Sequence, residues 1–268
     1  MKTLIFSGFG LNCENETAYA CEQVGFSQVE VHHINQLYSG TLDVFDYAFV
    51  VMIGGFMDGD DLGAARAGTN RYTYRPLPGG EGFLEQLHRF VEQGRLVLGI
   101  CNGFQLLVKL GLLPGRTEDA HRQQVSLTTN DNGRFEDRWV HLRVDPDSPS
   151  IYTRGLEQME LPIRHGEGRL VGATPELTDS LVNGHLSPLR YCTPEGEPTS
   201  SYPHNPNGSP HGMASLCNPQ GTVMGLMPHP EAYNHYTNHP RWTRKPAPTD
   251  EAGEGLALFK NAHTYLKG

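Results

Sequence analysis

The chain of 268 residues lacks an excess of positive charge, a long apolar run and a secretion signal. Its net charge of −9 argues against a nucleic-acid partner, which would require a basic face. The apolar stretch YAFVVMI at 47–53 is too short to span a bilayer, and the N-terminus MKTLIFSGFG has no long apolar core or cleavage site. We therefore expect neither a nucleic-acid nor a membrane partner.

Cysteine is present in an odd number, five, and no C-x-x-C pair occurs. This pattern argues against a disulfide framework and a structural zinc site, and it fits a reducing cytoplasm. We expect Cys13, Cys192 and Cys217 to be packing residues. His235 and His239 are four residues apart, but the pattern around them is not helical, so we expect solvated loop histidines and no metal site.

Two common phosphate-binding loops are also missing. The sequence contains no G-x-x-x-x-G-K-[ST] and no strand-linked G-x-G-x-x-G. We therefore expect no cofactor and no ATP site in this chain.

Short apolar stretches alternate with helical patterns over about the first 115 residues. This alternation predicts right-handed βαβ units and a parallel sheet. The expected strands are 2–8, 29–33, 46–55 and 96–100. The expected helices are 14–24, 81–93 and 102–110, with a long glycine-rich loop reaching about residue 80.

The second half of the chain has a different pattern. Four apolar stretches predict partly antiparallel strands at 139–144, 189–193, 213–217 and 222–227. A last helix is expected at 254–266, after a surface loop at 234–253. No clear linker interrupts the chain, so we expect one α/β domain over 1–268.

The stretch LGICNGFQLL, residues 98–107, places Cys101 between two glycines, after an apolar strand and before a helix. This is the G-x-nucleophile-x-G form of a sharp strand-to-helix turn. Such a turn exposes the thiol at the carboxyl end of the sheet, and the helix N-terminus favours the thiolate. Because cysteine is among the most buried residue types, a small core residue remains the alternative until a second element is found.

The second element is MPHPE, residues 227–231, which follows an apolar strand. His229 and Glu231 are two apart around a proline that favours extended backbone, so their side chains point to one side. Glu231 would orient His229, and His229 would exchange protons with Cys101. Taken alone, H-P-E is also compatible with a surface turn.

Together, these stretches resemble the class I (triad) glutamine amidotransferases. They are most similar to the glutaminase subunits of phosphoribosylformylglycinamidine synthase, of purine biosynthesis. The resemblance implies a flavodoxin-like fold with a central, mostly parallel sheet flanked by helices. The further stretches that carry it, in family order, are GFGLNCENE (8–16), IGGFMDGDDLGA (53–64), LPIRHGEGRL (161–170) and the run from YPHNPNGS to MPHPE (202–231).

The resemblance implies a role for each matching position. Cys101 is the nucleophile, His229 the base and acid, and Glu231 the orienting carboxylate. The backbone N–H groups of Gly55 and Asn102 form the oxyanion hole. The expected contacts with substrate glutamine are Phe56, Gln105, His165, Gly166 and Glu167.

Two positions depart from the family pattern. Ala232 stands where the family usually has Arg, and FMDGDD at 56–61 stands where FSYGD is more common. The first departure lies outside the triad, so we expect the chemistry to be retained. The second lies beside the oxyanion donor and affects the shape of that loop.

The resemblance also implies a partner. A separate synthase subunit would use ATP and magnesium to convert formylglycinamide ribonucleotide to formylglycinamidine ribonucleotide, and a small third subunit is compatible with this arrangement. Two alternatives remain open at this point. One is a glutaminase that serves a different acceptor synthase, and the other is a non-catalytic docking subunit on the same fold.

Overall fold

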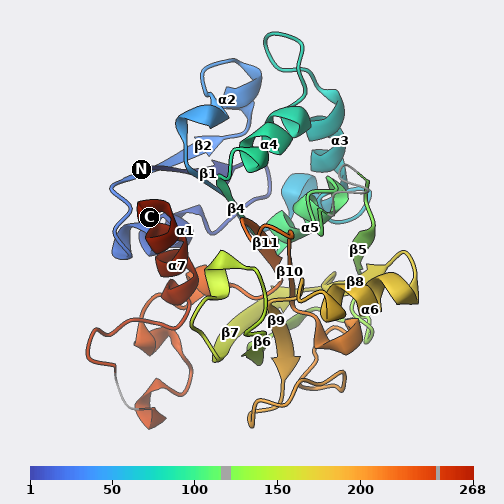
Figure 1. The fold of residues 1–268 in the computed structure, drawn as a ribbon, viewed down its shortest axis with the longest axis vertical. Coiled ribbons are helices and arrows are strands. Elements are labelled where there is room, and N and C mark those ends of the chain that lie inside the picture. Colours follow the sequence, from blue (N-terminus) through green and yellow to red (C-terminus); the bar gives the residue numbers. More distant parts are fainter. Residues whose placement is uncertain (116–121, 246–247) are drawn as a thin grey trace.

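The computed structural model describes residues 1–115, 122–245 and 248–268. Its centre is a six-stranded sheet with the order β10-β11-β4-β3-β1-β2, in which only β10 is antiparallel to its neighbour (Figure 1). The five parallel strands have the 2-1-3-4-5 order of flavodoxin-like folds. The strands are β1 (Lys2–Ser7), β2 (Gln28–His33), β3 (Phe49–Met52), β4 (Leu96–Ile100), β10 (Ser215–Cys217) and β11 (Val223–Leu226).

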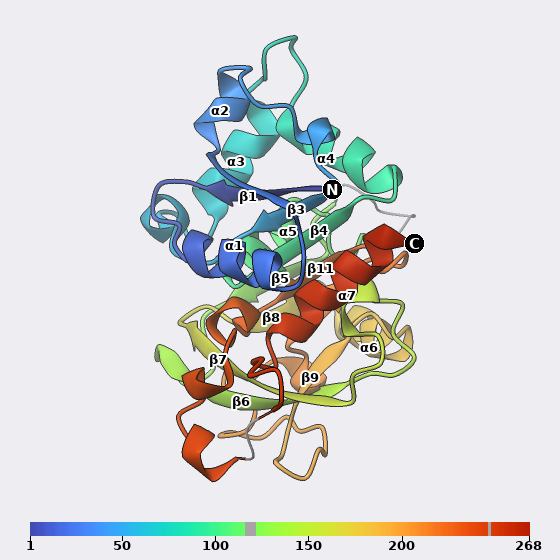
Figure 2. The same ribbon diagram turned by 90° about the vertical axis from the view of Figure 1, so that its left-hand side faces the viewer.

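The central strands are apolar because helices cover both faces of the sheet. Every residue of β3, β4 and β11 is buried. α1 and α7 lie on one face, and α3, α4 and α5 lie on the other (Figure 2). The helices are α1 (Glu14–Gln23), α2 (Asn35–Tyr38), α3 (Arg66–Tyr74), α4 (Phe83–Glu92), α5 (Asn102–Lys109), α6 (Pro175–Asn183) and α7 (Leu256–Lys267).

The second half of the chain adds two small antiparallel sheets, which lie below the central sheet in Figure 1. The orders are β7-β6-β9 and β5-β8. This confirms the predicted combination of a mostly parallel sheet with extra antiparallel strands. The strands are β5 (Val125–Thr128), β6 (Glu136–Val144), β7 (Gln158–His165), β8 (Arg169–Gly172) and β9 (Leu189–Cys192).

The prediction of a long loop up to about residue 80 is wrong, because helix α3 lies within that segment. Its sequence RAGTNRYTY has almost no apolar periodicity, and its buried residues are Gly68, Thr69 and Tyr72. Tertiary packing therefore decides this helix: Gly68 lies so close to Met57 that an added Cβ would be 1.9 Å from the sulfur. The elements β5, β7, β8 and α6 were also not predicted.

The segment 234–253 is only partly the surface loop that was expected. It contains the short 3₁₀ helices η6 (Tyr236–Asn238) and η7 (Trp242–Arg244), while residues 246–247 lie outside the described part. His239 is fully buried, and its Nε2 is 3.1 Å from Glu160 Oε2, so the expectation of a solvated histidine is wrong there. Among the described helices, none is long and apolar enough to cross a membrane.

Candidate active site

The carboxyl ends of four parallel strands meet at one cleft. The chain segments that follow β1, β3, β4 and β11 bring side chains there, and the turn between β7 and β8 closes the opposite wall. The cleft has a volume of about 420 Å³. It is lined by Asn12, Cys13, Glu16, Gly55, Phe56, Asp60, Cys101, Gln105, Phe135, Arg164, His165, Gly166, Glu167 and His229.

Cys101 occupies a strained turn between β4 and α5. Its φ of 51° and ψ of −103° lie outside the ordinary regions for a side-chain-bearing residue. The two flanking glycines are required by close contacts, as predicted. An added Cβ would lie 2.6 Å from Leu107 Cδ1 at Gly99 and 1.9 Å from the carbonyl oxygen of Met52 at Gly103. The thiol lines the cleft, so Cys101 is more than a core residue.

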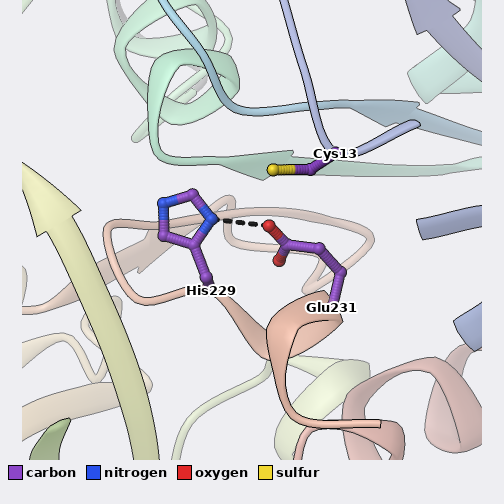
Figure 3. Close-up of side chains that lie close together, drawn as sticks. All are labelled: Cys13, His229 and Glu231. Atoms are coloured by element: carbon purple, nitrogen blue, oxygen red, sulfur yellow. Dashed lines mark hydrogen bonds and ion pairs between the residues drawn. The ribbon is translucent and has the colours of Figure 1, made fainter. Parts of the chain in front are cut away.

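His229 and Glu231 follow β11 and form a buried pair (Figure 3). His229 Nδ1 is 2.5 Å from Glu231 Oε1, and the side chains are 2% and 0% exposed. A carboxylate buried this completely requires a partner, and His229 supplies it. The other ring nitrogen, Nε2, is buried beside the cleft and has no hydrogen-bond partner within the described residues.

His229 and Cys101 lie close together, because both side chains contact the same glycine, Gly54. A Cβ added at Gly54 would be 2.9 Å from His229 Cε1 and 3.5 Å from Cys101 Cβ. Burial disfavours the charged imidazole, but the charges of Glu231 and Cys101 outweigh it and raise the pKa of His229 well above its ordinary value. The sequence-predicted nucleophile, base and carboxylate are therefore brought together.

Cys13 belongs to this cluster, so its expected role as a packing residue is wrong. In Figure 3 its sulfur points toward His229 and Glu231, and possible ligand atoms of the three residues lie within 4.8 Å of one another. They could in principle hold a metal ion, but the carboxylate already accepts the hydrogen bond of His229. Cys192 and Cys217 are fully buried, as expected.

Arg164 was not predicted for the site. Its Nη2 lies 3.8 Å from Glu231 Oε1 and donates to Cys13 Sγ at 3.4 Å, while its carbonyl oxygen accepts from Cys101 Sγ at 3.8 Å. Arg164 thus contacts both Cys101 and Glu231, two members of the predicted triad. The only sequence signal was its place beside His165 in the family-like stretch, which did not distinguish it from an exposed strand residue.

The two expected oxyanion donors remain available. The N–H of Phe56 donates to Gly10 O at 2.7 Å, whereas no backbone acceptor takes the N–H of Gly55 within the described residues. Asn102 is the first residue of α5, and its N–H has no acceptor inside the helix. Gly55 has a φ of 126°, and an added Cβ would be 2.6 Å from Gly10 O, so a glycine is needed there.

The side chain of Asn102 joins the oxyanion loop to α5. Its Oδ1 accepts from Met57 N at 3.2 Å, and its Nδ2 donates to Asp60 Oδ1 and Gln105 Oε1, each at 2.9 Å. Gln105 Nε2 in turn donates to Glu167 O at 2.6 Å. Gln105 therefore lines the cleft but uses its amide to hold the opposite wall in place.

The loop from His165 to Gly168 connects β7 to β8 and forms that wall. His165 is buried, and burial, reinforced by the charge of His229, lowers its pKa to about 3. Glu167 accepts from Ala64 N at 3.3 Å, and Phe56 stands half-exposed at the mouth, with its ring 6.5 Å from that of Phe135. All five residues expected to contact glutamine thus line one cleft.

The two departures from the family pattern have separate structural settings. Ala232 lies in the 3₁₀ helix η5 (Pro230–Ala232), where its N–H donates to His229 O at 3.3 Å. In the loop at 56–61, Asp58 forms an ion pair of 2.6 Å with Arg71 of α3. The unusual loop sequence is therefore fixed to the unpredicted helix.

Comparison with known proteins identifies the family. The sequence matches the CobB/CobQ-like glutamine amidotransferase domain over residues 1–266. It is 40% identical over 267 residues to phosphoribosylformylglycinamidine synthase subunit PurQ of Dehalococcoides mccartyi, covering 100% of this chain and 98% of that protein. Against human phosphoribosylformylglycinamidine synthase it is 35% identical over 271 residues, covering 96% of this chain but 20% of that longer protein.

A solved structure agrees with this result. A chain in the structure of PurLQS from Thermotoga maritima superposes with a TM-score of 0.70 and 25% identity, covering 99% of this chain and 98% of that one. The chain therefore belongs to the CobB/CobQ-like glutamine amidotransferase family.

Proposed function

We propose that the chain hydrolyses glutamine to glutamate and ammonia and delivers the ammonia to a phosphoribosylformylglycinamidine synthase subunit. That partner makes formylglycinamidine ribonucleotide from formylglycinamide ribonucleotide in de novo purine biosynthesis. Full-length relatives named as PurQ subunits of this synthase support the assignment. The observation that carries the chemistry is the buried His229–Glu231 pair beside Cys101.

The first half of the reaction is acyl transfer to the enzyme. The Cys101 thiolate attacks the side-chain carbonyl carbon of glutamine, and the N–H groups of Gly55 and Asn102 stabilise the oxyanion. His229 donates its proton to the departing nitrogen, and the C–N bond breaks. The products are ammonia and a γ-glutamyl thioester on Cys101.

The second half is hydrolysis of the thioester. His229, now neutral, accepts a proton from water as the water attacks the thioester carbonyl carbon. The same oxyanion hole serves this step. Glutamate leaves, the C–S bond breaks, and the proton on His229 restores the starting pair with the Cys101 thiolate.

The proposal includes a partner because ammonia that enters bulk water at neutral pH becomes protonated and unreactive. A synthase seated on the cleft would receive it directly. ATP and magnesium belong to that partner in this proposal, since the sequence lacks the common phosphate-binding loops. A small third subunit is compatible with the assembly.

The test is glutamate release from glutamine by the purified chain, alone and with the synthase subunit, its nucleotide substrate and ATP. We expect release to rise when the synthase is added and to fall by at least about 10⁴-fold in Cys101→Ala. Cys192→Ala, which changes a buried cysteine that does not line the cleft, is the matched control and should retain activity.

Other outcomes would select the alternatives. Cys101-dependent release that ignores this synthase would keep the glutaminase chemistry but assign it to a different acceptor. No release from the wild-type chain under any of these conditions would favour a non-catalytic docking subunit.

A further inference from the structure

We propose that Arg164 is a positioning residue, whose guanidinium group shares the charge of Glu231 and thereby keeps His229 able to release its proton as well as to hold it. This inference rests on the proposed glutaminase function and adds one residue to its acid–base machinery. Arg164 acts through Glu231 in this account and needs no contact with the substrate.

The end of strand β7 holds the proposed triad at three points. The carbonyl oxygen of Pro162 accepts a hydrogen bond from the N–H of His229 at 2.8 Å. The carbonyl oxygen of Arg164 accepts from the thiol of Cys101 at 3.8 Å. The guanidinium atom Nη2 of Arg164 lies 3.8 Å from Oε1 of Glu231. The strand that fixes the triad therefore also places a positive charge beside it.

The carboxylate oxygen that faces Arg164 is the one that binds His229. Oε1 of Glu231 lies 2.5 Å from Nδ1 of His229, so a protonated ring and a guanidinium group share one oxygen. In the part of the chain that the structure describes, no other arginine or lysine pairs with Glu231. A guanidinium group stays charged at every pH at which enzymes work, so this contribution is permanent.

The other groups that face His229 cannot replace this cation. Cys101 faces the ring from the turn between β4 and α5, and Cys13 faces it from the segment before α1. Both thiols favour the protonated ring. His165 is neutral at pH 7, because burial lowers its pKa to about 3 and the charge of His229 adds to this effect.

Arg164 is also the only arginine or lysine among the described residues that line the cleft. Two further cations act on neighbouring groups of the site rather than on the His229–Glu231 pair. The charge of Lys109 acts on Asp60 and Glu167, and the charge of Arg138 acts on His165. The remaining charged side chains that line the cleft are acidic: Glu16, Asp60 and Glu167.

The proposed reaction requires His229 to give up a proton and to take one back. Burial works against the charged ring, but the charges of Glu231 and Cys101 raise the pKa of His229 well above its ordinary value. A ring that binds its proton too tightly is a weak acid toward the departing nitrogen. A positive charge beside Glu231 opposes this effect, because it weakens the attraction between the carboxylate and the imidazolium.

The variants Arg164→Met and Arg164→Lys test the inference, because the first removes the charge and the second retains it. Both keep the backbone carbonyl that contacts Cys101. Ammonia release from glutamine is measured against pH for the complex with the synthase subunit. We expect Arg164→Met to move the alkaline limb of the kcat/KM profile upward by roughly 0.5–1 pH unit, because His229 then holds its proton to higher pH.

The separate kinetic constants distinguish this role from a contact with the substrate. At pH 7 we expect kcat of Arg164→Met to fall by about 2- to 10-fold, while KM changes by less than about twofold. Arg164→Lys should keep the alkaline limb of the wild type. Arg143→Met is the matched control, since Arg143 is exposed on the neighbouring strand β6 and does not line the cleft. It should change neither the limb nor kcat.

Two outcomes would overturn the inference. The first is an alkaline limb that stays in place in Arg164→Met, whatever the height of the profile. The second is a loss carried by KM with kcat unchanged, which would assign Arg164 to the substrate instead. A limb that moves equally in Arg164→Met and Arg164→Lys would likewise show that shape, and not charge, is responsible.

Titration of His229 by nuclear magnetic resonance separates this inference from the proposed function. The full chain, labelled with ¹³C at Cε1 of histidine, is titrated alone, and the signal missing from His229→Gln identifies the ring. Its midpoint should rise in Arg164→Met and stay in place in Arg164→Lys and Arg143→Met. A rise without turnover by the wild-type complex would support the inference and count against the proposed reaction. Turnover with an unmoved midpoint would count against the inference alone.

Discussion

At the scale of single residues, the chemistry of the cleft depends on how charge is balanced around His229. Its ring is fully enclosed, yet two neighbouring negative groups keep the charged form favourable. Glu231 supplies the larger of these contributions through its negative charge. It also pairs directly with the ring, and Arg164 lies 3.8 Å from the same carboxylate oxygen. Removing the charge of Glu231 should therefore change both rate and pH dependence.

We expect Glu231→Gln to lower kcat/KM for glutamine by about 10²- to 10⁴-fold, which is the usual rate contribution of a well-oriented general acid–base group. Because Glu231 raises the pKa of His229, the imidazolium of the wild type persists to higher pH than that of the variant. The alkaline limb of the pH–rate profile should therefore move to lower pH in Glu231→Gln. The profile of kcat/KM checks this, with the exposed Glu176→Gln as control. An unshifted limb would show that another group controls it.

At the scale of elements, the turn between β4 and α5 fixes Cys101, the proposed nucleophile, through glycines that leave no room for side chains. The backbone of α5 passes so close to β3 that Gly103 has no room for a Cβ beside the carbonyl of Met52. We expect Gly103→Ala to force these elements apart and to lower the free energy of unfolding by about 1–3 kcal/mol or more. Urea unfolding measures this loss.

The control for that prediction is Gly166→Ala, whose added carbon would contact only Phe135 Cδ2, at 3.8 Å. It should unfold at the urea concentration of the wild type. A Gly103→Ala variant as stable as this control would show that the turn adjusts without cost.

Elements with a strong local pattern were predicted from sequence, and the others depend on contacts that sequence does not display. The apolar strand β4 and the flanking glycines predicted the turn at Cys101, and H-P-E predicted the pair that follows β11. Helix α3 carries almost no apolar stripe, so only its packing against Met57 and its ion pair with Asp58 account for it. Cys13 and Arg164 reach the site through folding alone, from segments far from the triad in the chain.

At the scale of the whole molecule, the segment that precedes α7 is held against strand β7 through one buried carboxylate, that of Glu160. Glu160 of β7 is contacted by His239 at 3.1 Å, Arg241 at 2.9 Å and Lys245 at 2.7 Å. Burial works against its charge, but the hydrogen bonds from Lys245 and His239 outweigh it and lower the pKa of Glu160 to about 2. This cluster connects β7, which leads to the cleft wall, with the residues before α7.

We expect Glu160→Gln to lower the free energy of unfolding at pH 7 by roughly 1–3 kcal/mol, because Arg241 and Lys245 lose the negative charge with which they both pair. A carboxylate with a lowered pKa stabilises the fold above its ordinary value of 4.5, and this contribution is lost as the pH falls toward about 2. The stability difference between wild type and variant should therefore shrink between these limits. Urea unfolding over that range tests it, with the exposed Glu157→Gln as control. A difference that does not vary with pH would contradict the assignment.

The site is divided between the segments that follow β4 and β11, and this has a consequence for the chain while it is being synthesised. Ribosomes make the segment with the thiol of Cys101 long before the segment with His229 and Glu231. A nascent chain, or a fragment cut before β11, thus carries the proposed acceptor of acyl groups without its proposed base. Glutamine is consumed only after the whole polypeptide has been made and its distant segments have met.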